Sequence, residues 1–339
     1  MEDSSSYLSP HHFNMRVISN FKRMGSVAAS DASLDYEYVG EELGAPAFLR
    51  KCLGADVVIL NIDQKRLMLA SMLRWVWPFA RFRLVSSDLI LRPPKSWKDR
   101  LKVFVKRLLF SRVDRFVLYF KELGGYERFY GIGHDRVAYV PFKVNGWEEI
   151  EARPRASNEG EYVLCAGRTL RDVGTFVEAL RRAGCPGVLL QQKRELLAEH
   201  GTAAWESGLP PNVKLVVDES DSLEEYLGFI ERARVVVIPR FKGDIAPTGI
   251  STYMVAMALG RPVVISEGPG ADDVLDGQAA LVPPEDPARL AEQVKRLWED
   301  EGERAELAAR GRAYAEQSRG EERLLSDILR ASLEGSRRE

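Results

Sequence analysis

Short apolar segments rich in β-branched residues alternate with helical patterns from about residue 15 onward. Runs such as Val235-Val236-Val237-Ile238 are apolar without alternation, which is typical of a parallel strand covered on both faces. Strand–helix–strand alternation in both halves predicts two doubly wound, Rossmann-like α/β domains. The predicted strands are 15–19, 36–39, 57–61, 83–86, 116–120 and 138–140, then 162–166, 187–191, 214–217, 234–239, 262–266 and 280–282.

The length of 339 residues suits two packed domains. Residues 146–160 are polar, contain a proline and a glycine, and lack hydrophobic periodicity, so we place a linker there. The expected parts are an N-terminal domain 1–145, the linker 146–160, a second domain 161–315 and a C-terminal helix 316–339. Two such domains in series predict an interdomain cleft between the carboxyl ends of two parallel sheets.

Composition excludes several classes of protein. Lys plus Arg is 48 and Asp plus Glu is 50, a net charge of −2 that argues against a dedicated nucleic-acid binder. The most apolar run, 67–77, is short for a membrane span and contains Arg74. Three cysteines without metal-ligand spacing argue against a disulfide scaffold and predict a reducing, cytoplasmic setting. The polar residues 1–12 do not resemble a signal peptide.

The most informative segment runs from the strand at 234–239 through a loop into a helix predicted at 252–259. Gly249, Ser251 and Thr252 lie where free backbone N–H groups and hydroxyls collect at the helix N-terminus. Orphan donors and the helix dipole both favour a negative charge there, so the segment predicts a phosphate site. The alternative is that Ser251 only caps the helix.

A second loop, 267–273, follows the next predicted strand at its carboxyl end. Gly268 and Gly270 would allow a ligand to approach the backbone closely. A generic connection between a strand and a helix would also contain glycine. This loop therefore indicates a ligand site only in combination with the predicted phosphate site at 249–252.

The second half resembles a known family. Residues 248–297 resemble the nucleotide-sugar domain of retaining GT-B glycosyltransferases, the large family 4 group. The similarity lies in Ala256-Met257-Ala258-Leu259-Gly260-Arg261-Pro262-Val263-Val264, in Asp276-Gly277, and in the run from Leu281 to Leu290. Cys165-Ala166-Gly167-Arg168 is similar to the glycine–arginine loop that follows the family's first donor-domain strand.

The resemblance implies that the domain 161–315 binds a UDP- or GDP-linked sugar and that the domain 1–145 binds a glycan or lipid-linked acceptor. Arg168 would clamp the diphosphate as a catalytic residue, since a planar guanidinium suits phosphate oxygens; a surface ion pair is the alternative role. The expected phosphate-binding set is Gly167, Arg168, Arg171, Lys242, Thr248, Gly249, Ile250, Ser251 and Thr252. Glu267, Gly268 and Gly270 are expected on the sugar or ribose side.

The chain departs from the family at three positions. Pro247 and Val255 stand where the family has two glutamates eight residues apart, and Val173 stands where a lysine is expected. Arg171 or Lys242 would have to supply the missing positive charge, and Asp244 the sugar-binding carboxylate. Losing one hydrogen-bonded carboxylate costs about 1.5–3 kcal/mol. A non-catalytic relative that binds nucleotide or glycan is therefore the alternative function.

The N-terminal domain offers fewer signals. The family often places a histidine near the donor, and no histidine of this chain follows a clear mid-domain strand. Asp63 and Asp88 do follow predicted strands, at the edge where an acceptor hydroxyl would bind. The alternative is that these aspartates cap the helices that follow them. We take Asp88 as the acceptor-side catalytic candidate.

Residues 95–115 form a basic amphipathic pattern, with eight Lys or Arg against two Asp. Trp97, Leu101, Phe104, Val105 and Leu108 fall on one helical face. One interpretation is a helix that packs this face onto its domain. The other is attachment to an anionic membrane surface, which would make the protein peripheral on the inner face of the membrane.

Together these signals predict a glycosyltransferase that moves a sugar from a nucleotide-diphosphate donor to a hydroxyl acceptor with retained anomeric configuration, in the synthesis of a polysaccharide or another glycan. No Asp-x-Asp motif occurs in the sequence, and cationic side chains with a helix dipole would replace a metal ion. We expect no cofactor and no metal.

Overall fold

The computed structural model of the chain describes residues 14–29, 31, 33–153, 160–167, 169–193, 197, 202, 204–205, 208–220 and 222–334. The polar N-terminal segment, part of the expected linker and Arg168 lie outside these described residues. The described residues fall into two compact units, one within 1–89, 108–117 and 325–339, the other within 90–107 and 118–324. No helix among them is long and apolar enough to cross a membrane.

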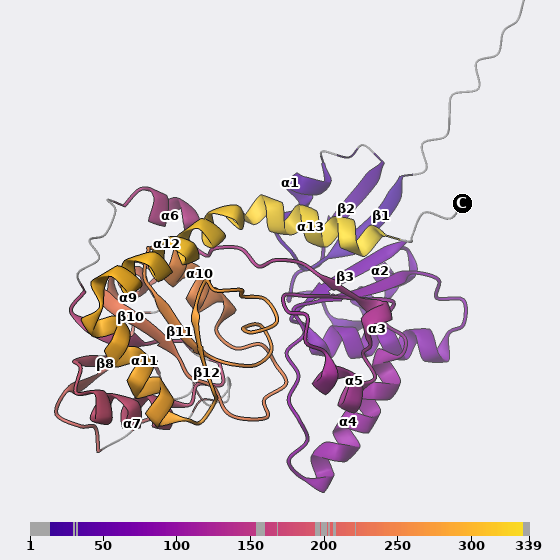
Figure 1. Cartoon of the computed structure of the whole chain (residues 1–339). Helices are drawn as coiled ribbons and strands as arrows, with labels where there is room; N and C mark the ends of the chain where they lie inside the picture. The colour runs from indigo at the N-terminus through magenta and orange to yellow at the C-terminus, as the bar shows by residue number, and fades with distance from the viewer. Residues whose placement is uncertain are drawn as a thin grey trace, which may run out of the picture. The chain divides into compact units, whose positions relative to one another are not determined.

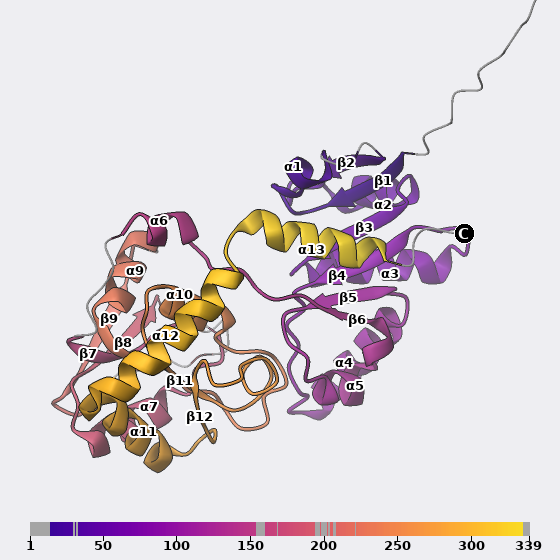
Figure 2. The same ribbon diagram turned by 45° about the horizontal axis from the view of Figure 1, so that its top comes forward.

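A six-stranded parallel sheet is built from the first half of the chain, with strand order β2-β1-β3-β4-β5-β6 (Figures 1 and 2). From β1 the chain first adds β2 on one side and then adds β3 to β6 on the other side. The strand order therefore changes direction between β1 and β3. Its strands are β1 (Met15–Ser19), β2 (Leu34–Tyr38), β3 (Val57–Asn61), β4 (Arg83–Ser87), β5 (Arg115–Leu118) and β6 (Val137–Tyr139). Its helices are α1 (Met24–Ala28), α2 (Ala45–Leu53), α3 (Gln64–Val76), α4 (Trp97–Phe110) and α5 (Gly124–Tyr130).

A second six-stranded parallel sheet has the order β12-β11-β10-β7-β8-β9, which changes direction between β7 and β10. Its strands are β7 (Tyr162–Cys165), β8 (Gly187–Gln192), β9 (Val213–Asp218), β10 (Ala233–Ile238), β11 (Val263–Ser266) and β12 (Ala280–Val282). The helices of this half are α6 (Trp147–Glu151), α7 (Val173–Ala183), α9 (Leu223–Glu231), α10 (Ile250–Ala258), α11 (Pro287–Glu299) and α12 (Glu301–Gln317); α13 (Glu321–Leu333) follows them.

Both faces of the second sheet are covered, as its uninterrupted apolar strands require. Val235 and Val237 pack with α7 and α11 in one buried cluster. Their neighbours Val236 and Ile238 point to the opposite face and are also completely buried. Each predicted strand overlaps an observed strand, so the prediction of two doubly wound α/β sheets is confirmed.

Local signals set the helix starts on this scaffold. The side chain of Asp286 accepts hydrogen bonds from the backbone N–H groups of Ala288 and Arg289, and Pro287 occupies the first helical position of α11. Asp172 caps α7 in the same way by accepting from the N–H of Thr175. The start of α10 lacks such a side-chain cap, which distinguishes it from these two helices.

Candidate functional site

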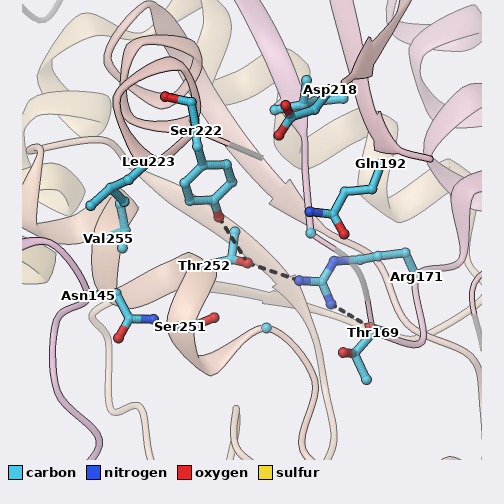
Figure 3. A pocket seen from close by; sticks show the side chains of 14 residues that line it. Asn145, Thr169, Arg171, Gln192, Asp218, Ser222, Leu223, Ser251, Thr252 and Val255 are labelled. Atoms are coloured by element: carbon cyan, nitrogen blue, oxygen red, sulfur yellow. Dashed lines mark hydrogen bonds between the residues drawn. The ribbon is translucent and has the colours of Figure 1, made fainter. Parts of the chain in front are cut away.

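A pocket of about 310 Å³ opens at the carboxyl edge of the second sheet (Figure 3). Its walls come from the loop after β7, the ends of β8 and β9, the start of α9, and the loop and helix that follow β10. The pocket therefore lies at β7 and β10, where the strand order changes direction and doubly wound sheets bind their ligands. The lining residues are Asn145, Gly167, Thr169, Arg171, Leu190, Gln192, Asp218, Ser222, Leu223, Tyr226, Gly249, Ser251, Thr252 and Val255.

Arg171 is the central cation of this pocket and is only 3% exposed. Its guanidinium donates to the carbonyl oxygens of Ala166 (3.0 Å) and Thr169 (2.9 Å). The third bond goes to Oγ1 of Thr252 at 3.1 Å, as Figure 3 shows. All of these acceptors are neutral, and no described carboxylate forms an ion pair with it. Burial lowers the pKa of Arg171, but an arginine side chain stays charged in proteins. Arg171 is therefore a buried positive charge with no negatively charged partner among the described residues.

A second buried arginine, Arg240, follows β10 and was not singled out from the sequence. It forms an isolated antiparallel bridge with Arg171 through the backbone. Its guanidinium donates to the carbonyl oxygens of Asp244 (2.9 Å), Ala246 (3.2 Å) and Pro269 (3.2 Å). Burial lowers its pKa too, and the proximity of Arg240 lowers the pKa of Arg171. The carboxyl edge of the sheet thus holds two neighbouring cations that repel each other.

Helix α10 presents its N-terminus to the pocket. Its N-cap is Gly249, at φ 85°, and no side chain caps the helix. A Cβ at Gly249 would lie 2.5 Å from Ile238 and 3.3 Å from the Arg171 guanidinium, so only glycine fits this turn. The interpretation in which Ser251 caps the helix is wrong, because Ser251 is the second residue of α10 and lines the pocket.

The hydroxyl of Thr252 is oriented by two donors. Its Oγ1 accepts from Arg171 and also from the Tyr226 hydroxyl at 3.4 Å. A hydroxyl has two acceptor lone pairs and one O–H, so both acceptor positions are used and the O–H remains to donate. No described residue accepts that proton. Thr252 therefore adds a hydrogen-bond donor beside the helix start.

Other walls of the pocket differ in chemistry. Leu190, Leu223 and Val255 supply apolar surface, while Gln192 and Asp218 end β8 and β9 with polar groups. The sequence analysis missed Asn145, Gln192, Asp218 and Tyr226. A position at the carboxyl end of a predicted strand was the available signal for Gln192 and Asp218.

The structure separates the remaining sequence candidates from the pocket lining. Thr248 is buried and its Oγ1 has no partner among the described residues. Lys242 and Glu267 are exposed, and the N–H of Lys242 donates to Glu285. Gly268 packs against the Arg240 guanidinium, where a Cβ atom would lie 2.3 Å from it. Gly270 packs against Pro247, where a Cβ atom would lie 2.9 Å from it. Ile250 is the buried first residue of α10. No described cluster of three or more His, Cys, Asp or Glu is arranged to hold a metal.

Asp244 is half-buried in the loop after β10. Burial raises the pKa of its carboxyl group, although the nearby Arg240 opposes the shift. Its Oδ2 atom is buried without a partner among the described residues, while its backbone carbonyl accepts from Arg240. This loop therefore carries a carboxylate oxygen with unused acceptor capacity.

Asp88 lies in the other compact unit, directly after β4. Its backbone has φ 51°, a left-handed conformation that is uncommon for residues other than glycine. Its N–H donates to the carbonyl of Val117 at 3.1 Å, which continues the parallel ladder by one bond. Burial raises the pKa of its carboxyl group to about 6. Asp88 is therefore a strained, partly desolvated acid at the carboxyl edge of the first sheet.

Comparison with known proteins agrees with the chemistry of the second half. Residues 163–300 match the family described as Glycosyl transferases group 1. The resemblance inferred from the sequence is confirmed for these residues. No curated protein matches the chain.

Solved structures resemble the chain over nearly its whole length. A glycosyltransferase from Rickettsia africae matches at a TM-score of 0.64 and 11% identity, covering 95% of this chain and 98% of its own. HepE from Anabaena, in complex with UDP and glucose, matches at 0.60 and 16%, covering 94% and 98%. Sucrose-phosphate synthase from Thermosynechococcus elongatus matches at 0.60 and 15%, covering 90% and 94%. At these identities the similarity establishes the GT-B fold.

Two serines of the same pocket provide a matched test of the helix starts. Ser222 caps α9 by accepting from the N–H of Glu225, whereas Ser251 caps nothing. We expect Ser222→Ala to lower the free energy of unfolding by about 1 kcal/mol and Ser251→Ala to change it by less than about 0.5 kcal/mol. Urea unfolding of both variants measures the difference. Equal losses would restore the capping role of Ser251.

The raised pKa of Asp88 predicts a pH-dependent stability. Its pKa rises from 3.8 to about 6 on folding, so the folded state loses stability as the pH rises through this range. Two pKa units correspond to about 3 kcal/mol. Asp88→Asn should therefore be more stable than wild type at pH 8, by up to about 3 kcal/mol, and should match it below pH 4. Urea unfolding at both pH values tests this, and a pH-independent difference would contradict it.

Proposed function

We propose that the protein transfers a sugar from a nucleotide-diphosphate donor, UDP- or GDP-linked, to a hydroxyl of a glycan or lipid-linked acceptor. The single observation that carries the proposal is the buried guanidinium of Arg171, which has no carboxylate partner among the described residues, beside the uncapped start of α10. A diphosphate would supply the negative charge that this edge of the sheet lacks. The match of residues 163–300 to a glycosyltransferase family supports the same ligand.

The donor phosphates would bind the N–H groups of Ser251 and Thr252, the Thr252 hydroxyl and Arg171. When the bond from the anomeric carbon to the phosphate oxygen breaks, its electron pair stays on that oxygen. Fixed donors and a buried cation stabilise this charge without reorganising. Because Arg171, Arg240 and the helix dipole supply positive charge, we propose that transfer needs no metal ion. We propose retention of the anomeric configuration from the family resemblance.

Gly167 lines the pocket, and Arg168 is the next residue in the sequence. We therefore retain Arg168 as a second residue that binds the diphosphate. Asp244 is the proposed contact for the transferred sugar, since its buried Oδ2 has unused acceptor capacity. We assign Lys242, Thr248, Glu267, Gly268 and Gly270 to the outer part of the donor site. In the other unit, Asp88 is the proposed contact for the acceptor hydroxyl, and its pKa of about 6 suits proton uptake near neutral pH.

We propose that residues 1–145 form the acceptor domain, 146–160 the linker, 161–315 the donor domain and 316–339 a C-terminal helix.

A non-catalytic protein that binds a nucleotide or a glycan is the second candidate function. Val255 favours it specifically, since this residue is buried in the pocket wall where the family places the ribose-binding glutamate.

Thermal melting with UDP, GDP, ADP and their sugar conjugates tests donor binding. A nucleotide at 100 times its dissociation constant should stabilise the protein by about 2.7 kcal/mol. Ser251→Ala should weaken that nucleotide several-fold, because it removes one hydroxyl from the pocket without altering the fold. Release of the nucleoside diphosphate as the sugar passes to a hydroxyl of an added glycan acceptor or to water, unchanged by EDTA, would establish metal-independent turnover.

Three outcomes of this experiment are distinct. A shift with turnover supports the transferase. A shift without turnover, with every conjugate, favours the non-catalytic binder. The absence of any shift would overturn the donor site. Asp286→Ala is the control, since Asp286 caps α11, is not among the residues that line the pocket, and changes stability alone.

We also propose that the protein attaches to an anionic membrane surface. The interpretation in which the apolar side of α4 packs onto the domain is wrong: Trp97, Leu101, Phe104, Val105 and Leu108 are 43% to 72% exposed. We call these five residues the apolar–basic face, because lysines and arginines along the same helix are also exposed.

The end of α4 is joined to α3. The indole N–H of Trp75 donates to the carbonyl of Leu108 at 3.1 Å, and the Arg112 guanidinium stacks 4.2 Å from the Trp75 ring. Lys95, Lys98, Arg100, Lys102 and Arg107 are also exposed along α4. Each basic group near an anionic surface contributes about 1 kcal/mol, and aromatic side chains suit the interface. Charge and exposed apolar area therefore both complement an anionic bilayer.

Vesicle co-sedimentation tests the membrane proposal. We expect the protein to pellet with vesicles containing phosphatidylglycerol at low salt and to be released as salt rises. Leu101→Ser combined with Phe104→Ser should weaken binding at least tenfold, since both apolar side chains would enter the interface. The matched control, Leu53→Ser with Val217→Ser, removes exposed apolar side chains elsewhere. Equal binding by both double variants, or no binding by wild type, would contradict the proposal.

A further inference from the structure

One side chain in the pocket of the second sheet comes from outside that sheet. Asn145 follows β6, the last strand of the first sheet, and precedes α6, whereas the other lining residues lie between Gly167 and Val255. Figure 3 shows its side chain with the others around the pocket. All of the lining residues, Asn145 included, belong to the same compact unit. The segment that connects the two sheets therefore contributes a polar group to this pocket.

Backbone contacts on both sides hold Asn145 in place. The N–H of the buried Val144 donates to the carbonyl oxygen of Ser318 at 3.4 Å. Gly146 is the N-cap of α6 with φ 68°, and a Cβ atom there would lie 3.0 Å from the side chain of Leu223. The positive φ and the close approach both favour glycine at this turn. Because Leu223 lines the same pocket, the turn fixes Asn145 beside an apolar part of the wall.

The amide group of Asn145 is not used by the fold. It is half-buried and forms no hydrogen bond with another described residue. Polar side chains of α9 in the same pocket do have partners, because Ser222 accepts from the N–H of Glu225 and the Tyr226 hydroxyl donates to Thr252. The Asn145 side chain carries one acceptor oxygen and two N–H donors on a backbone that is already fixed. It is therefore available to a ligand.

An amide group suits sugar hydroxyls better than it suits a phosphate. Phosphate oxygens only accept hydrogen bonds, so a phosphate would engage Nδ2 of Asn145 and leave Oδ1 without a partner. Two neighbouring hydroxyls of a sugar ring, a vicinal diol, can accept from Nδ2 and donate to Oδ1 at the same time. The apolar side chains of Leu223 and Val255 in the same wall match the C–H groups of such a ring.

We infer that Asn145 is a specificity-determining residue that binds a vicinal diol of the sugar nucleotide through both ends of its amide group. The diol belongs either to the ribose of the nucleotide or to the transferred sugar, and the two sources differ in which ligands become sensitive to Asn145. The inference rests on the proposed sugar transfer, since a sugar nucleotide must occupy the pocket. It assigns the hydroxyl contact to the segment between the sheets, because Val255 on α10 is apolar.

Isothermal titration calorimetry of the full chain with UDP, GDP, ADP, their 2′-deoxy forms, UDP-glucose and GDP-mannose tests the inference. Asn145→Leu removes the amide group and breaks no hydrogen bond of the fold, so the melting temperature should stay unchanged. We expect this variant to weaken the tightest ligand roughly threefold to tenfold. If the diol is the ribose, loss of the 2′-hydroxyl should weaken wild type similarly and leave the variant unaffected. If it is the transferred sugar, only the conjugate should be weakened.

Lys143→Ala is the matched control in the same segment. It removes the ion pair of Lys143 with Glu321 at 3.1 Å, and Lys143 does not line the pocket. Its affinity for every ligand should equal that of wild type. Equal losses in Lys143→Ala and Asn145→Leu would show that Asn145 acts only through the position of the segment, which would overturn the inference.

Two further results separate this inference from the donor proposal. Asn145→Leu might leave the affinity for every ligand unchanged, or weaken the diphosphate, its 2′-deoxy form and the conjugate equally. Either result would overturn the role of Asn145 and keep the donor site. A wild-type protein that binds none of these nucleotides would remove the donor site and this inference with it.

Discussion

The buried guanidinium of Arg171 joins the loop after β7 to the helix that follows β10, through the carbonyls of Ala166 and Thr169 and the hydroxyl of Thr252. The same charge has no anionic partner among the described residues, and Arg240 stands beside it. Its contacts order the loops, and in the proposed donor site a bound anion would balance its charge.

The first sheet also has a pocket at its carboxyl edge, and the two sheets place their pockets by the same rule. Each pocket lies where the strand order changes direction, because adjacent connections then lead to opposite faces and leave a crevice. The lining decides what each crevice is suited to bind. In the second sheet, Arg171 has no carboxylate partner among the described residues and α10 starts without a side-chain cap, which favours a diphosphate there.

Most of the fold was predictable from local patterns in the sequence. Apolar runs such as 235–238 and capping pairs such as Asp286-Pro287 act within a few residues, so the strands and several helix starts were predicted. Arg240, Gln192 and Asp218 were missed because strands distant in sequence meet only once the sheet order is known. The exposure of Phe104 was unpredictable for a similar reason: helical spacing shows which residues share a face but not what covers it.

We propose, as the central claim, that a nucleotide diphosphate binds at the start of α10. A crystal structure of the protein with the nucleotide that stabilises it most tests this directly. We predict phosphate oxygens within hydrogen-bond distance, about 2.7–3.2 Å, of the backbone N–H groups of Ser251 and Thr252 and near the Arg171 guanidinium. A nucleotide bound elsewhere, or one whose phosphates point away from α10 into solvent, would contradict the claim.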